Sequence, residues 1–276
     1  MTDEKTIQLT LEYLSFAVLG ALVLFQLLHF VMAGWRFWKE SPWRIVRTLA
    51  VGAFWVFYGL FFVITVTGIP SYKEAVPYVL CGLYAPSLLA IVLLILSQKF
   101  RKFVDRMSLR WTIQSVEGPA RMIVGILFLF WFFAGRLPGV VAWVAGPGDW
   151  IAGFIAFHAV RRLHIFKDVA GIGNQHWSIS DFRKGIQGKS FSPYKDRMKR
   201  HLNLAIAFVG FGILDFILAP ASTALSIMLG EVPEEMGRLP LTLIPLVLVP
   251  QVLLLEVFAM HQLIGFKRLL QTNEIK

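Results

Sequence analysis

Three acidic residues lie inside long apolar stretches of the chain, where an ionisable side chain is unusual. Asp149 stands in the motif Gly-Pro-Gly-Asp-Trp at 146–150, Asp215 in Gly-Ile-Leu-Asp at 212–215, and Glu256 in a leucine-rich stretch. Removing a charged group from water is costly unless it is neutralised or paired. A carboxylate in such a place is therefore a candidate for proton exchange, cation binding or pairing with a buried base.

Prolines accompany all three carboxylates. Pro147 lies just before Asp149, Pro220 follows Asp215 by little more than one helical turn, and Glu256 comes after prolines at 240, 245 and 250. Proline has no backbone donor and clashes with the preceding turn, so it kinks or breaks a helix. We therefore expect a broken helix at Pro147, an interruption at 219–220, and a bent or broken helix before Glu256.

The arrangement of the apolar residues predicts the fold class. Hydrophobic residues make up 57% of the chain and charged residues only 16%, with a mean hydropathy of +0.65. They fall in blocks of about twenty, the helix length that crosses a hydrocarbon layer about 30 Å thick. We predict an all-α, polytopic integral membrane protein, a single transmembrane helical domain over residues 1–276. Its spans, about seven in number, are 9–33, 45–66, 76–97, 120–135, 139–160, 202–228 and 241–265.

Lysines and arginines gather in alternate gaps between these spans. Of the 27, only Lys5, Lys73, Arg136 and Arg238 lie at the N-terminus or after spans two, four and six. Basic segments stay on the cytoplasmic side of a membrane, so we expect the N-terminus outside and the C-terminus in the cytoplasm. This alternation accounts for the net charge of +10 without nucleic acid as a partner. Arg121, near the start of its short span, is expected to reach the interface.

Within these spans the three carboxylates fall at similar depth. At a rise of about 1.5 Å per residue, Asp149, Asp215 and Glu256 lie roughly 16, 20 and 14 Å from the cytoplasmic ends of their helices. We predict a midplane polar site made by these residues, with Gln251 as a further member if the preceding proline distorts the turn. Two structural alternatives stay open: Asp149 caps a broken helix, or Asp215 is a neutral carboxyl bonded to another helix.

Four histidines form a second pattern near the cytoplasmic helix ends: His29, His158, His201 and His261. Because histidine titrates near neutral pH, a relay through His29, His158 and His261 would exchange protons with the cytoplasm. Alternatively, His29 and His261 would ligate haem b from two helices. The third interpretation is interfacial histidines bonded to backbone or lipid headgroups.

Several other activities lack a sequence signature. There is no phosphate-binding glycine loop, no His-Glu-x-x-His and no Gly-x-Ser-x-Gly. No nucleophile–base pair and no metal-ligand cluster stand out, so an enzyme is less expected than a non-enzyme. The segment 161–200 carries ten lysines and arginines. This predicts attraction of the basic cytoplasmic loops to anionic headgroups of the lipid bilayer, or a protein partner docked at 161–200.

The sequences at 146–150 and 212–215, together with Leu-Ile-Pro-Leu-Val-Leu-Val-Pro at 243–250, form a pattern in the C-terminal half of the chain. It resembles a group of uncharacterised bacterial multispan membrane proteins. The resemblance implies a multi-pass protein of the bacterial cytoplasmic membrane and brings no activity with it. Members often carry a histidine where Glu256 stands, so this position departs from the pattern.

These observations lead to three hypotheses about function. The first is transport or proton-linked handling of a small molecule at the midplane polar site. The second is a haem- or quinone-linked membrane subunit. The third is a non-catalytic assembly or sensory component that binds a partner through its basic loop.

Overall fold

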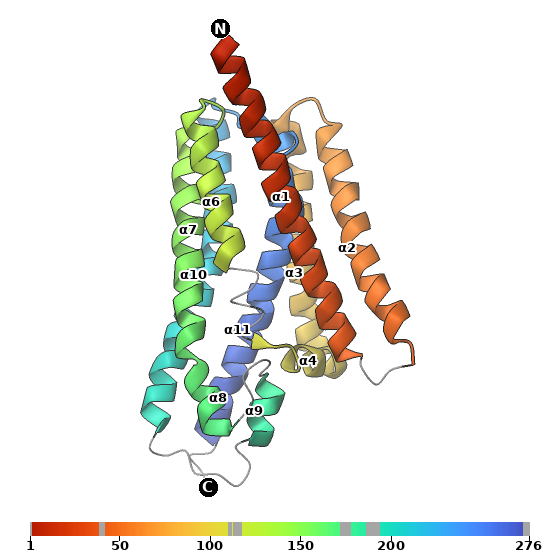
Figure 1. Ribbon diagram of the computed structural model, residues 1–276, viewed down its shortest axis with the longest axis vertical. Coiled ribbons are helices and arrows are strands. Elements are labelled where there is room, and N and C mark those ends of the chain that lie inside the picture. The colour runs from red at the N-terminus through yellow and green to blue at the C-terminus, as the bar shows by residue number, and fades with distance from the viewer. Residues whose placement is uncertain are drawn as a thin grey trace.

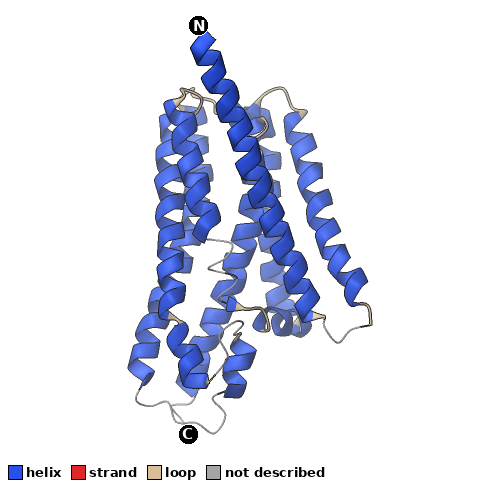
Figure 2. Cartoon of the chain, in the orientation of Figure 1, coloured by secondary structure: helices blue, strands red, loops and turns tan. Residues whose placement is uncertain are grey.

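The computed structural model describes residues 2–38, 42–109, 112, 118–171, 178–185 and 194–272. Within these ranges the chain is almost entirely helical and contains no strand (Figure 2). Six helices are long and apolar enough to cross a membrane. Their bounds are α1 (Thr2–Phe37), α2 (Arg44–Thr67), α3 (Tyr72–Leu96), α7 (Gly139–Arg162), α10 (Lys195–Met228) and α11 (Val249–Thr272).

The long helices lie side by side, with α11 in the middle (Figure 1). Of the apolar segment of α11, 83% is buried, against 24% for α1 and 22% for α2. The outer helices instead expose large apolar side chains such as Phe57, Leu96 and Phe133. A soluble monomer rarely exposes so continuous an apolar surface, whereas lipid tails are its natural solvent.

One apolar helix is shorter than the others. The expected span at 120–135 is α6 (Gly118–Phe133), 16 residues long, or about 24 Å at the rise of an α-helix. Figure 1 shows α6 beside only the part of α7 nearest the N-terminal end of the bundle, so it begins at mid-depth. Its Trp131 is buried and donates to the hydroxyl of Ser15 on α1 at 2.9 Å. Arg121, in the first turn of α6, is also buried, so the start of α6 is inside the bundle and not at its surface.

Most of the shorter elements lie at the two ends of the bundle. At the end opposite the N-terminus are α4 (Gln98–Asp105), α8 (His164–Ala170) and α9 (Ile179–Gly185) (Figure 1). At the other end is a 3₁₀ turn, η3 (Glu234–Gly237). A π-helical turn, η4 (Ile244–Leu248), lies inside the bundle against Gly59 of α2 and Gly82 of α3 and leads directly into α11. The bend expected before Glu256 is thus a π-helical turn, a local widening of the helix.

The expected breaks at Pro147 and Pro220 are absent, because α7 and α10 each continue through their proline. Each proline leaves unpaired the carbonyl four residues earlier, which another donor must satisfy. For Pro220 this is the carbonyl of Phe216, and it accepts the hydroxyl of Tyr84 on α3 at 2.8 Å. A side chain of α3 therefore supplies the hydrogen bond that α10 has lost at Pro220.

A second tyrosine also donates to a carbonyl that a proline has released. Pro86 lies inside α3 and frees the carbonyl of Gly82. The hydroxyl of Tyr58 on α2 donates to this carbonyl. Helices α2, α3 and α10 are thus connected in series by two tyrosine hydroxyls, each bonded to a carbonyl that a proline has released.

The Tyr84 hydrogen bond can be tested with a double-mutant cycle. We expect Tyr84→Phe to lower stability by about 1–3 kcal/mol, because it leaves the Phe216 carbonyl buried without a donor. In a Pro220→Ala background the loss should be much smaller, because the backbone N–H at 220 then bonds that carbonyl. Thermal unfolding of the four proteins in detergent measures the coupling. Equal losses in both backgrounds would contradict the assignment.

Candidate functional site

Arg121 lies at the centre of a buried ionic cluster that joins four helices. Its Nε donates to Oδ1 of Asp149 on α7 at 2.9 Å, and its Nη1 donates to Oε1 of Glu256 on α11 at 2.6 Å. Its Nη2 donates to Oδ2 of Asp215 on α10. Each guanidinium nitrogen therefore serves a different carboxylate from a different helix. We call these four side chains the Arg121 cluster.

All four members of the Arg121 cluster are withdrawn from the surface. Their exposed fractions are 3% for Arg121, 6% for Asp149, 4% for Asp215 and 1% for Glu256. The ring of Phe216 lies against the guanidinium, with the central carbon 4.1 Å from the ring centroid, a favourable cation–π contact. The second oxygen of Glu256, Oε2, is buried without a hydrogen-bond partner among the described residues.

Glycines make room for the carboxylates. A Cβ atom on Gly148 would overlap Oδ1 of Asp215, so α10 places its carboxylate directly on the backbone of α7. A Cβ on Gly212 would overlap Oε1 of Glu256 and lie 3.0 Å from Nη1 of Arg121. The motifs Gly-Pro-Gly-Asp and Gly-Ile-Leu-Asp thus each pair a carboxylate with a glycine that admits a carboxylate from another helix.

A second set of glycines brings α6 and α7 together and so carries Arg121 to its partners. A Cβ on Gly125 would overlap the carbonyl oxygen of Gly146, and a Cβ on Gly153 would crowd the carbonyl of Gly118 and the backbone of Met122. Small residues allow such close backbone approach between membrane helices. Arg121 lies within this contact region, which directs its side chain toward α7 and the helices beyond.

The position of Arg121 corrects the sequence analysis. Its side chain does not reach an interface, because α6 begins at mid-depth and Arg121 is in its first turn (Figure 1). The alternative that Asp149 caps a broken helix is also wrong, since α7 is continuous and the carboxylate pairs with the guanidinium. The buried cation that the three carboxylates require was present in the sequence but was assigned to the wrong depth.

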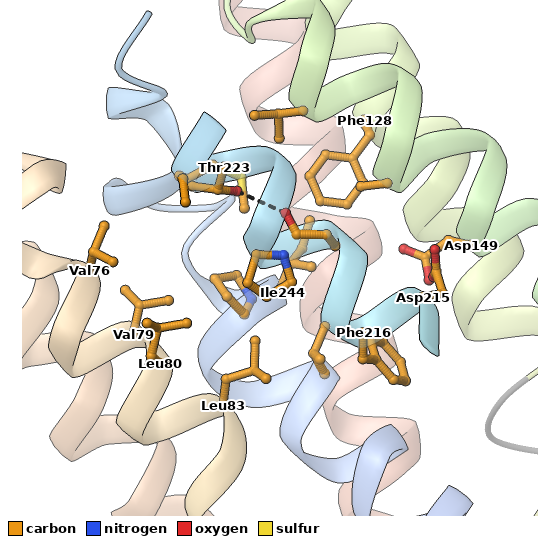
Figure 3. A pocket seen from close by; sticks show the side chains of 18 of the residues that line it. Val76, Val79, Leu80, Leu83, Phe128, Asp149, Asp215, Phe216, Thr223 and Ile244 are labelled. Atoms are coloured by element: carbon orange, nitrogen blue, oxygen red, sulfur yellow. Dashed lines mark hydrogen bonds between the residues drawn. The ribbon is translucent and has the colours of Figure 1, made fainter. Parts of the chain in front are cut away.

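Two cavities touch the Arg121 cluster from opposite sides. The outer cavity, about 100 Å³, extends from Asp149 and Asp215 toward the end of the bundle where Tyr72 and Met236 lie. Apart from Thr223 its other walls are mostly apolar, and Figure 3 shows the two carboxyl groups together at one side of it. The inner cavity, about 10 Å³, lies between Arg121, Glu256 and three alanines of α7: Ala152, Ala156 and Ala159. It is about the size that one water molecule needs.

The charges of the Arg121 cluster do not balance when all four groups are ionised, because one guanidinium faces three carboxylates. Among the described residues no group of three or more histidine, cysteine or acidic side chains is arranged to hold a metal ion. The guanidinium itself fills the space between the carboxylates. Uncompensated buried charge costs several kcal/mol per ion. The arrangement therefore favours uptake of protons, or of a cationic group that reaches the outer cavity.

Among the described side chains, Gln251, His158 and His261 are not bonded to this cluster. Gln251 is buried on α11, but its amide oxygen has no hydrogen-bond partner in the described part of the chain. His158 is exposed on α7 and packs on the rings of Phe154 and Phe157. His261 Nε2 lies 3.2 Å from Oδ1 of Asp105, next to α4. The side chain of His29 lies outside the described part.

The role of Arg121 can be separated from that of an ordinary ion pair. We expect Arg121→Leu to lower stability by about 3–5 kcal/mol, because it leaves three facing carboxylates without a cation. Asp149→Asn should cost about 1 kcal/mol or less, because the amide oxygen still accepts the Nε hydrogen bond. Thermal unfolding in detergent is the measurement.

The matched control is Arg136→Leu, which removes an arginine from a partly exposed pair with Glu235 at 2.8 Å. Such pairs contribute about 0–1 kcal/mol. Adding Asp215→Asn to Arg121→Leu should restore part of the lost stability by reducing repulsion. If Arg121→Leu were no more harmful than Arg136→Leu, the cluster would not be the organising interaction that its geometry indicates.

Comparison with known proteins adds no assignment to this geometry. No family model matches the chain, and neither the curated proteins nor the solved structures give a significant match.

Proposed function

We propose that the chain is a multi-pass membrane protein that couples proton movement to the handling of a small molecule at the Arg121 cluster. The observation that supports this most is the position of one arginine and three carboxylates, buried between an outer and an inner cavity. Buried ionisable residues within membrane helices mark ion, proton or substrate pathways more often than they serve packing.

The charge imbalance gives the proposal a mechanism. Electroneutrality requires two of the three carboxylates to be protonated or matched by another cation. A ligand with a cationic or donor group that reaches Asp149 and Asp215 from the outer cavity would replace these protons. Arg121 would then redistribute its hydrogen bonds among the carboxylates, which lie on different helices. Exchange of protons for ligand would therefore change the hydrogen bonds and charge interactions that hold α7, α10 and α11 together.

The lining of the outer cavity suggests the kind of ligand. Side chains such as Val79, Leu83, Phe128 and Ile244 make its walls apolar, and the acidic groups lie only at its inner end (Figure 3). Ligand sites generally combine such apolar walls with a few polar groups that fix orientation. We therefore favour a small, largely apolar molecule with a cationic or hydrogen-bond-donating end.

A cysteine reporter tests this coupling without knowledge of the substrate. In a Cys81→Ser background, which removes the chain's single cysteine, Thr223→Cys places a thiol in the wall of the outer cavity. We expect its reaction with a small, membrane-impermeant thiol reagent to change severalfold between mildly acidic and mildly alkaline buffer. The change reflects a different helix arrangement once the cluster gains or loses protons. Asp215→Asn should abolish it.

The control thiol is Glu231→Cys, on the exposed turn beyond α10, which reports the effect of pH on thiol chemistry alone. Rates at the cavity are expressed relative to this control. A constant ratio at both pH values, or one that Asp215→Asn leaves unchanged, would refute proton-linked rearrangement at the Arg121 cluster.

We also propose a bacterial cytoplasmic membrane as the location, with the end that carries α4, α8 and α9 in the cytoplasm. The concentration of lysine and arginine at this end supports the orientation. A reporter enzyme active only outside the cytoplasm should function when fused to the N-terminus or to the turn at Glu231, and fail at the C-terminus. The reverse activity pattern would invert the orientation.

A further inference from the structure

A large cavity opens between α7, α8 and α10, at the end of the bundle that carries the basic segments. Its volume is about 850 Å³, and it is separate from the two cavities at the Arg121 cluster. Arg161 and Arg162 close α7 and form one wall, while Arg197 and His201, in the first turns of α10, form another. We call this the basic pocket.

The basic pocket gathers cations with little compensation. Three arginines and two histidines, His164 and His201, line it together with a single acidic residue, Asp168. Arg197, Arg162 and Arg200 are all close enough to His201 to act on it electrostatically. Within the described residues, Arg161, Arg162 and Arg197 make no ion pair. Like charges held together on a rigid frame create a strong local field that attracts anions.

The chemistry of the lining narrows the class of anion. A guanidinium offers a planar fork of donors that matches phosphate oxygens, and several forks around one cavity can hold one phosphate from several sides. The same cavity has an apolar side, formed by Ile165, Val169 and the half-exposed ring of Tyr194. An apolar wall beside the arginines suits the carbon part of an ester better than it suits a bare inorganic ion.

We propose that the basic pocket binds a phosphate ester, with Arg161, Arg162 and Arg197 as the groups that hold the phosphate. The pocket lies where the membrane-spanning helices end, at the depth of lipid headgroups. The ester is therefore either the headgroup of an anionic phospholipid or a soluble phosphorylated molecule. This proposal does not depend on the function proposed for the Arg121 cluster.

The test compares two probes on the whole protein. Native mass spectrometry after extraction from nanodiscs of phosphatidylglycerol and phosphatidylcholine counts retained lipid, and titration with glycerol 3-phosphate measures a soluble ester. The pocket variant is Arg161→Gln with Arg197→Gln. We expect it to lose about tenfold in affinity per arginine, the effect of one charge-assisted hydrogen bond.

The control variant is Arg183→Gln with Lys184→Gln. It removes the same charge from the exposed face of α9 and leaves the pocket lining intact. Selective retention of phosphatidylglycerol, lost only in the pocket variant, identifies a lipid headgroup. Binding of glycerol 3-phosphate, lost in the same way, identifies a soluble ester. Equal binding by wild type and pocket variant, or equal loss in the control, overturns the proposal.

Discussion

The guanidinium of Arg121 is the group around which α6, α7, α10 and α11 are arranged. A cation removed from water must find anions, and each of its three nitrogens finds one on a different helix. The carboxylates are equally constrained, because in the described part of the chain Arg121 is the one cation bonded to all three. Helices α6, α7, α10 and α11 therefore cannot be repositioned independently without breaking a buried ionic contact. Apolar packing alone sets no such register, since lipid tails compete with leucine and phenylalanine for every apolar surface.

Satisfaction of backbone groups is the second constraint, and tyrosines meet it at two of the prolines, Pro86 and Pro220. The hydroxyls of Tyr58 and Tyr84 bond carbonyls that Pro86 and Pro220 have released. Water is absent from the hydrocarbon region, so a donor from a neighbouring helix is needed there. Pro86 and Pro220 consequently mark contacts between helices and not ends of helices, and α10 continues through a position where the sequence suggested interruption.

The long apolar helices could be predicted from the sequence, and so could the common level of the three carboxylates along their helices, because both follow from residue spacing along one chain. Arg121 could not be placed in this way. It follows a basic segment and begins a short apolar block, a pattern typical of an interfacial residue. The contact of Gly118 with Gly153 and the burial of Arg121 show instead that α6 starts inside the bundle. A signal for Arg121 exists in the charges: three carboxylates buried together require a cation, and Arg121 lies within the apolar block 120–135, which has no acidic residue of its own. Gln251 was expected at the site because it is close to Glu256 along the chain, and closeness along the chain does not specify which face of a helix meets a neighbour.

Phe216 connects features that the sequence keeps apart. Its ring lies against the guanidinium of Arg121, its backbone carbonyl holds the hydroxyl of Tyr84, and its side chain borders the outer cavity. Because Pro220 has released that carbonyl, this stretch of α10 is anchored to α3 by a side chain instead of by its own helical ladder. A shift of the guanidinium would press on the Phe216 ring and strain the hydrogen bond from Tyr84. The part of α10 that lies beyond Phe216 would then tilt about this point, one turn before Pro220. The wall of the cavity would then move with the charge state of a cluster that it touches only at one end.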